Sequence, residues 1–165
     1  MKKMIREYDN VRNPMLGAYV LWNFVLGYYL DKNEYVPIEL MFIVLPMTLK
    51  EDIAKQIQST NKSSGMRAMS DKFMTTNVLK NDLISSIHTN IEKMKEITAD
   101  SLAEAIKTGL ISMDIATNTI FPLELKKRNS EAADILKIKK NAEKLGQWCA
   151  GLSLVEIEDI LKVRF

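Results

Sequence analysis

The chain has 165 residues and a formal charge of +2, from 23 lysines and arginines against 21 aspartates and glutamates. This length suits one domain whose hydrophobic core needs no disulfide or metal ion for stability. The near-neutral charge argues against strong attraction of the whole protein to nucleic acid or to a membrane surface. The single cysteine, Cys149, excludes an internal disulfide and a metal site built from several thiolates. A lone cysteine and a start without a signal-peptide pattern together predict a cytoplasmic protein.

The first predicted helix is the apolar sequence NPMLGAYVLWNFVLGYYL, residues 13–30. Asn13 and Pro14 suit a helix start, because asparagine caps helices and proline is tolerated at the first helical position. Apolar residues on nearly every face are typical of a helix buried in a core. The run is at the lower limit of length for a membrane span, and Asn23 and two glycines interrupt it. We therefore expect a core helix centred on Trp22, without membrane contact.

Two shorter helices are expected next and complete an apolar helical core, residues 1–60. The first, residues 37–45, ends or kinks at Pro46, although the weak alternation of apolar residues there also fits a strand. The second covers residues 50–58, with two isoleucines on one face. The polar run STNKSSG, residues 59–65, predicts a connecting loop, since it lacks the Walker pattern of a phosphate-binding loop.

The middle part of the chain, residues 66–125, contains a predicted helix over residues 78–97, whose apolar residues recur at three- and four-residue spacing. Thr98 is expected to cap a second helix, residues 99–108, and Gly109 suits its C-terminal end. Helix, tight turn and helix form the beginning of a winged-helix arrangement.

A hairpin is expected to complete this winged-helix-like unit. Two short apolar runs, residues 110–115 and 119–123, flank a three-residue polar turn. In DNA-binding winged helices the second helix enters the major groove, but here that helix carries two carboxylates and one lysine, which suit phosphates badly. A structural or protein-contacting role therefore competes with DNA binding as the function of this unit.

The C-terminal part, residues 126–165, is predicted to hold two helices. A long one runs from residue 129 or 130 to Ala150, with one apolar seam and many lysines on the rest of its surface. Ser153 and Glu156 form a capping box that starts a short last helix. The lysines make either a solvated face or a surface for an acidic partner or a nucleic-acid backbone. Six cations are the candidate partner-binding residues: Lys126, Lys127, Arg128, Lys137, Lys140 and Lys144.

Enzymatic chemistry is not predicted. A Cys–His pair can form a thiolate nucleophile, but no motif surrounds His88, the only histidine, or Cys149. A zinc site needs more histidine or cysteine ligands than the chain provides. The carboxylate pairs lie among polar positions, not in an apolar pocket that would tune them for acid–base catalysis. We expect no catalytic residues, no metal ion and no cofactor.

Several blocks of glycines and apolar residues, in order along nearly the whole chain, carry a family resemblance. The blocks are Asn13-Pro14, Leu16-Gly17, Leu21-Trp22 and Phe24; Val44-Leu45-Pro46; residues 63–65; residues 102–111; Ala142, Leu145-Gly146, Trp148 and Ala150; and residues 160–164. In this order they resemble the middle component of three-component ABC systems, antiphage defence operons that include the Lamassu type. The chain departs from the family pattern at Cys149, where a phenylalanine would be usual.

The resemblance implies a small, non-enzymatic adaptor subunit. Its partners would be an SMC/Rad50-like ABC ATPase that senses foreign DNA and an effector such as a nuclease, with DNA contacted only weakly or indirectly. A free-standing winged-helix DNA-binding regulator is the alternative function, and a small enzyme of unrecognised type is a third class. For the fold, we expect a mainly α, compact multi-helix domain over residues 1–165, with the winged-helix-like unit in its second half.

Overall fold

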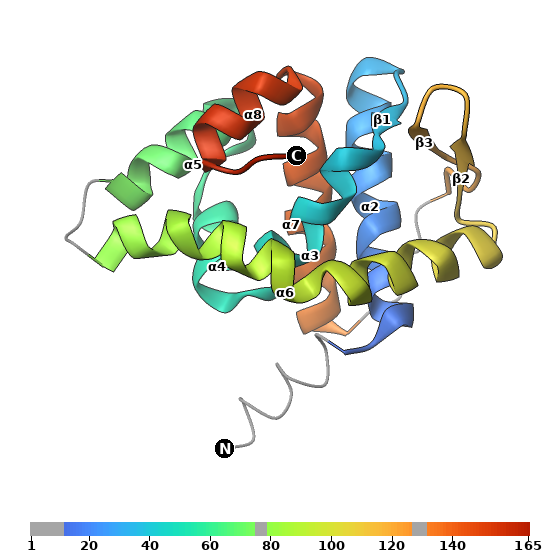
Figure 1. Ribbon diagram of the computed structural model, residues 1–165, viewed down its shortest axis with the longest axis horizontal. Coiled ribbons are helices and arrows are strands. Elements are labelled where there is room, and N and C mark those ends of the chain that lie inside the picture. Colours follow the sequence, from blue (N-terminus) through green and yellow to red (C-terminus); the bar gives the residue numbers. More distant parts are fainter. Residues whose placement is uncertain (1–11, 75–78, 127–131) are drawn as a thin grey trace.

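The structure, a computed structural model, describes residues 12–74, 79–126 and 132–165. Helices dominate it and a small sheet lies at one side (Figure 1), so the predicted mainly α class is confirmed. In chain order the elements are α2 (Pro14–Lys32), β1 (Val36–Pro37), η1 (Ile38–Leu40), α3 (Met41–Leu49), α4 (Glu51–Ser59), η2 (Lys62–Ser64), α5 (Gly65–Met74), α6 (Leu79–Lys107), β2 (Ile111–Asp114), β3 (Thr119–Pro122), α7 (Ala133–Ala150) and α8 (Leu154–Leu161).

Helix α2 begins where the sequence predicts. Oδ1 of Asn13 accepts hydrogen bonds from the backbone N–H groups of Met15 and Leu16 at 3.0 and 3.2 Å, and Pro14 is the first helical residue. All residues from 20 to 28 are buried, because neighbouring elements cover α2 on every side. Within the described ranges, every helix falls short, in length or in apolar character, of what a bilayer crossing requires.

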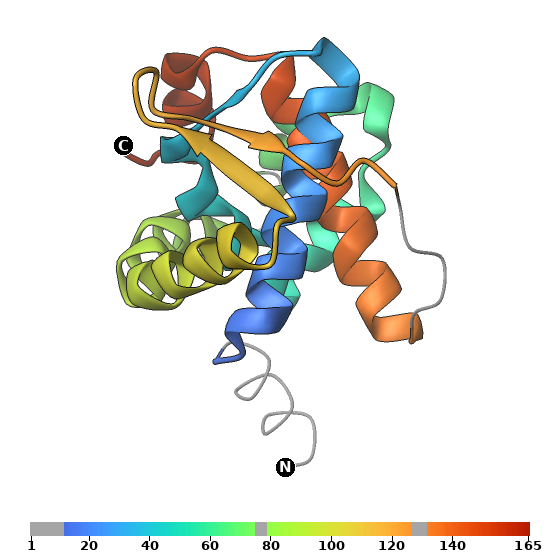
Figure 2. The same ribbon diagram turned by 90° about the vertical axis from the view of Figure 1, so that its right-hand side faces the viewer.

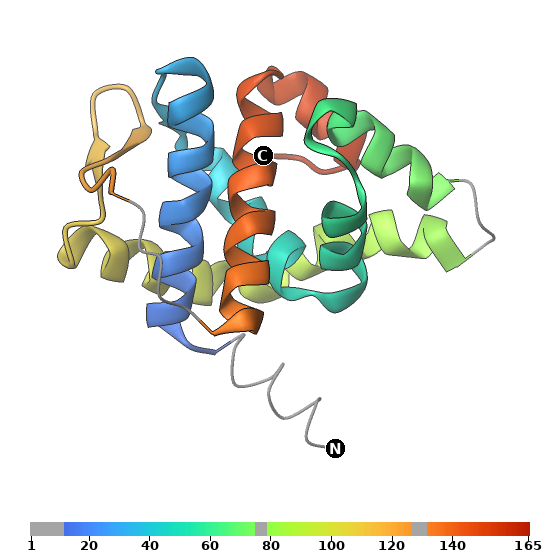
Figure 3. The same cartoon turned by 180° about the vertical axis from the view of Figure 1, so that it is seen from behind.

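Helices α2 and α7 lie side by side and run in the same direction (Figures 1 and 3). Two glycines let their backbones touch. A Cβ atom at Gly27 would overlap the carbonyl group of Glu143, and a Cβ atom at Gly146 would overlap the carbonyl oxygen of Phe24. The two helices come from opposite ends of the chain, so this contact joins its beginning to its end.

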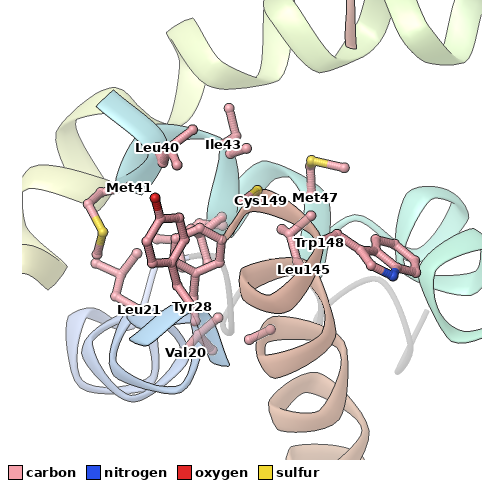
Figure 4. Close-up of a cluster of buried hydrophobic side chains, with 14 of the residues drawn as sticks. Val20, Leu21, Tyr28, Leu40, Met41, Ile43, Met47, Leu145, Trp148 and Cys149 are labelled. Carbon is pink, nitrogen blue, oxygen red and sulfur yellow. The ribbon is translucent and has the colours of Figure 1, made fainter. Parts of the chain in front are cut away.

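The core forms where α2, α3 and α7 meet (Figure 4). Helix α3 is almost entirely buried, and Pro46 lies inside it without ending it. The strand alternative for this segment is therefore wrong, because in mid-core only a helix satisfies its own backbone hydrogen bonds without a neighbouring strand. The labelled core side chains are Val20, Leu21 and Tyr28 of α2, Leu40 of η1, Met41, Ile43 and Met47 of α3, and Leu145, Trp148 and Cys149 of α7.

Helix α6 crosses α2 and α3 as one continuous helix of 29 residues (Figures 1 and 2). The predicted helix break at Thr98 is wrong, since Thr98 and Ser101 are both fully buried inside this helix. No glycine or proline lies nearby to stop the helix, and continuing it lets Ser101 pack against Gly17 of α2. Without a turn at Thr98, the two helices predicted over residues 78–108 are one helix, which leads directly into the hairpin.

The predicted hairpin is confirmed, and it belongs to a three-stranded sheet in the order β1-β3-β2. Strand β1 comes from a distant part of the sequence and pairs antiparallel with β3, with Val36 opposite Ile120. Trp22 is fully buried, as expected, and its indole N–H donates a hydrogen bond to the carbonyl oxygen of Glu124 at 2.8 Å. This bond ties the segment that follows the hairpin to the central helix.

Helices α5 and α8 pack on each other on the side of the molecule away from the hairpin (Figure 1). Helix α5 was not predicted, although Met66, Met69 and Phe73 form a buried stripe along it. The helix begins at Gly65, the last residue of a polar run that predicts a loop, and it is too short for its apolar spacing to give a clear signal. The capping box of α8 is confirmed, with the Ser153 and Glu156 side chains each accepting a hydrogen bond from the other's backbone N–H.

Candidate partner-binding groove

An open groove of about 570 Å³ lies between α7 and the segment that connects α4 to α5. Figure 3 shows these elements side by side. We name this feature the lysine groove and define it by the residues that line it: Gln58, Lys62, Ala133, Leu136, Lys137, Lys140, Asn141, Glu143, Lys144 and Gln147. Four lysines and one carboxylate give the lining an excess of positive charge, which favours an acidic ligand.

Helix α7 supplies three of these four lysines. Lys137, Lys140 and Lys144 are separated by three and four residues, so they share one face of the helix. Lys137 and Lys140 are exposed, and neither ammonium group forms a hydrogen bond or ion pair with another residue that the structure describes. Another face of α7 packs on α2 through Gly146, so one helix serves both the core and the groove.

Lys144 differs from the other two lysines because it holds the opposite wall of the groove in place. Its Nζ donates hydrogen bonds to the carbonyl oxygens of Ile57, Gln58 and Thr60 at 3.0, 3.3 and 2.9 Å. Two of these carbonyls belong to the last turn of α4, where intrahelical donors run out and the helix dipole favours a cation. The Lys144 ammonium is therefore engaged within the chain, contrary to its expected place on a free lysine face.

The turn after α4 is fixed by further groups around Lys144. Lys72 reaches it from α5, where its Nζ donates to the carbonyl oxygen of Ser59 and the hydroxyl of Thr60, both at 2.9 Å. Burial, followed by the neighbouring Lys72 ammonium, lowers the pKa of Lys144. The Lys144 ammonium also lies 5.9 Å from the centre of the Trp148 ring, within the range of a cation–π contact.

Two more side chains of α7 fasten the same wall. The indole N–H of Trp148 donates to the carbonyl oxygen of Lys62 at 2.8 Å, and Nδ2 of Asn141 donates to the carbonyl oxygen of Ala54 at 3.1 Å. The side chain of Lys62 therefore leaves an anchored backbone at the groove edge, with its Nζ 3.6 Å from Oδ1 of Asp31. This ion pair is long and largely exposed, so another carboxylate can replace Asp31 at little cost.

The remaining predicted cations lie away from the groove or outside the described residues. Lys126 follows β3, is exposed and does not line the groove; its backbone N–H donates to the carboxylate of Glu124 at 2.7 Å. Lys127 and Arg128 fall outside the residues that the structure describes. Lys62 is not among the predicted cations, because it joins the lysines of α7 only through contacts between distant parts of the chain.

The two residues considered for thiol chemistry lie in different environments. Cys149 is fully buried in the apolar core, which raises the pKa of its thiol, whereas His88 is exposed on α6. A reactive cysteine needs an accessible thiolate with a lowered pKa, and Cys149 has the opposite properties. Within residues 12–74, 79–126 and 132–165, no three histidine, cysteine, aspartate or glutamate side chains are grouped to hold a metal ion.

The whole chain, residues 1–165, matches the model of a family described as ABC-three component (ABC-3C) system Middle Component 3. The chain therefore belongs to this family of middle components, whose place in a multi-subunit system implies partner proteins. No curated protein and no solved structure is detectably similar to it. Of the residues that carry the resemblance, Gly17, Trp22, Gly146 and Trp148 are buried, so these four positions serve the packing of the helices.

Proposed function

We propose that this chain is the non-enzymatic adaptor subunit of an antiphage ABC system. In this role it binds an SMC/Rad50-like ABC ATPase and an effector such as a nuclease, in the cytoplasm. The adaptor couples the state of the ATPase, which senses foreign DNA, to restraint or release of the effector. The observation that carries the proposal is the match to the middle-component family over the full 165 residues.

The lysine groove supports a binding role for the chain. Its exposed lysines, Lys137 and Lys140, lie on α7. The other faces of this helix pack against neighbouring helices of the same chain. Exposed charges of this kind steer association and set the choice of partner more than they add affinity. By contrast, Cys149 and Lys144, whose pKa values are shifted by burial, serve the core and the wall of the groove.

A winged-helix DNA-binding regulator receives no support from a specific observation. The continuous helix α6 offers no separate recognition helix, and its C-terminal part carries Asp100 and Glu104 with Lys107 as the cation. The carboxylate of Glu104 lies 3.8 Å from the ammonium group of Lys107 and offsets part of the positive charge that a phosphate would need. We expect the isolated chain to bind duplex DNA weakly and without the steep salt dependence of many phosphate contacts.

Co-expression of the tagged chain with the proteins encoded beside it tests the proposal. The expected result is a stoichiometric complex, stable in size-exclusion chromatography, that contains an ABC ATPase and an effector. The untagged chain expressed in the same cells is the control for nonspecific capture. Recovery of the chain alone, with neither partner, would contradict the adaptor function.

A further inference from the structure

We infer that the lysine groove binds an acidic segment of a partner protein, with a large apolar side chain of that segment seated over Leu136. The inference rests on the proposed adaptor function and adds the chemistry of one partner contact. It follows from three properties of the groove: walls fixed before binding, lysines available at its rim and apolar side chains in its lining.

The two walls of the groove are joined by hydrogen bonds. Side chains of α7 donate five such bonds to backbone carbonyl groups of the α4–η2 segment, from Asn141, Lys144 and Trp148. A partner segment therefore meets a preformed surface, which lowers the entropy cost of ordering the site on binding. Lys144 contributes to this wall and not to the partner contact.

The rim carries charge on both sides. Lys137 and Lys140 of α7 are exposed and without a partner among the described residues, and Lys62 on the other wall is held only by its 3.6 Å pair with Asp31. A partner carboxylate gains these two lysines directly and competes with Asp31 for the third. An acidic segment thus meets positive charge along both edges of the groove.

The apolar part of the lining distinguishes a peptide from a nucleic acid as the ligand of the groove. Leu136 is 38% exposed although it is large and apolar, and Ala133 is exposed one turn before it. Both side chains line the groove, and with the aliphatic stems of the lysines they form an apolar strip beside the charges. A phosphate backbone has no apolar group to cover this strip, whereas a leucine or phenylalanine of a peptide buries it.

The first experiment treats the purified, co-expressed complex with a zero-length carbodiimide, which joins lysine amines to carboxylates in direct contact. We expect Lys62, Lys137 or Lys140 to be linked to one partner segment that has a large apolar residue within a helical turn of the linked carboxylate. If the complex assembles but these lysines link to no partner carboxylate, the inference is wrong and the adaptor function stands. If no complex forms, both are wrong.

The second experiment measures binding of a fluorescent peptide with the sequence of the linked segment. The double variant Lys137→Glu, Lys140→Glu should bind roughly 10-fold more weakly than the wild type. The matched control is Lys93→Glu, Lys95→Glu, which makes the same charge change at exposed positions of α6 and should leave binding unchanged. Equal melting temperatures of the two variants establish that both are folded.

Two further measurements separate the apolar contact from the charges and a peptide from DNA. Leu136→Ser should weaken peptide binding several-fold while leaving its salt dependence intact, because the lysines remain. A short labelled duplex DNA should bind the wild type no better than it binds the groove variant. Binding of that duplex, lost in the groove variant while peptide binding is retained, would make the groove a nucleic-acid surface and overturn the inference.

Discussion

On the α2 side of helix α7 the two backbones touch, whereas on the α4 side charged and polar side chains bridge the space between them. The first contact depends on Gly27 and Gly146, where any Cβ atom meets main-chain atoms that cannot rotate away. The second depends on the side chains of Lys144 and Trp148, which reach carbonyl groups across the space. We call the α2–α7 contact the dry side of α7 and the α4–α7 contact its bridged side. The dry side should contribute more to the free energy of unfolding, whereas the bridged side mainly shapes the surface of the groove.

The largest expected effect is on the α2 side, at Trp22. Trp22→Ala removes a fully buried indole and its hydrogen bond to Glu124, which should lower the free energy of unfolding by roughly 3–5 kcal/mol. Chemical denaturation monitored by circular dichroism measures the change, with Trp22→Phe as the milder control. An unchanged melting temperature for Trp22→Ala would show that Trp22 is not part of the core.

The next effect tests the backbone contact itself. Gly146→Ala would normally favour a helix, but here the added methyl group overlaps the Phe24 carbonyl, so we expect a loss of roughly 3 kcal/mol. Gly151→Ala is the matched control, because its φ is −85° and the nearest atom to the new methyl group would be 3.7 Å away. Equal stability of the two variants would mean that α2 and α7 are not in backbone contact.

On the dry side, the free energy of unfolding should also depend on pH, because Cys149 is buried there. Burial raises the pKa of this thiol above its ordinary value of 9.0, so the folded state favours the protonated form. That contribution is complete below pH 9 and is lost as the pH rises further, by about 1.4 kcal/mol per pH unit while the folded thiol stays protonated. Denaturation from pH 8 to 10 should show a total loss of about 1.4 kcal/mol from this thiol in the wild type and a smaller loss in Cys149→Ala. Parallel slopes would contradict the buried thiol.

The smallest effect is expected on the bridged side, at Lys144. Lys144→Met keeps the apolar stem but removes the donor to three carbonyl groups, and water can replace part of the loss, so about 1 kcal/mol is expected. Hydrogen exchange should accelerate at the turn after α4 and not in α2. Lys140→Met, an exposed lysine on the same face, is the control and should change neither quantity. Similar exchange in both variants would show that Lys144 does not hold this wall.

Local sequence rules account for the elements whose causes lie within a few residues. The Asn13 cap, the hairpin and the Ser153 capping box all form as predicted, because donor and acceptor are near neighbours in the chain. The same rules fail at Thr98, a predicted helix start that lies inside α6, and Pro46 lies inside α3 without ending it. Packing on α2 and in the core outweighs the local preference at both positions, and a window of a few residues does not contain that packing energy.

The sequence alone determined the central helix, the lysine-rich face of α7 and, through the order of its glycines and apolar residues, the resemblance to middle components. It did not determine which of those lysines are free. Lys144 turns toward carbonyl groups that lie 84 to 87 positions earlier in the chain, and Lys62 becomes the facing wall through a bond over a similar separation. Only the tertiary structure brings such groups together, because a contact between distant residues depends on how all the intervening helices pack.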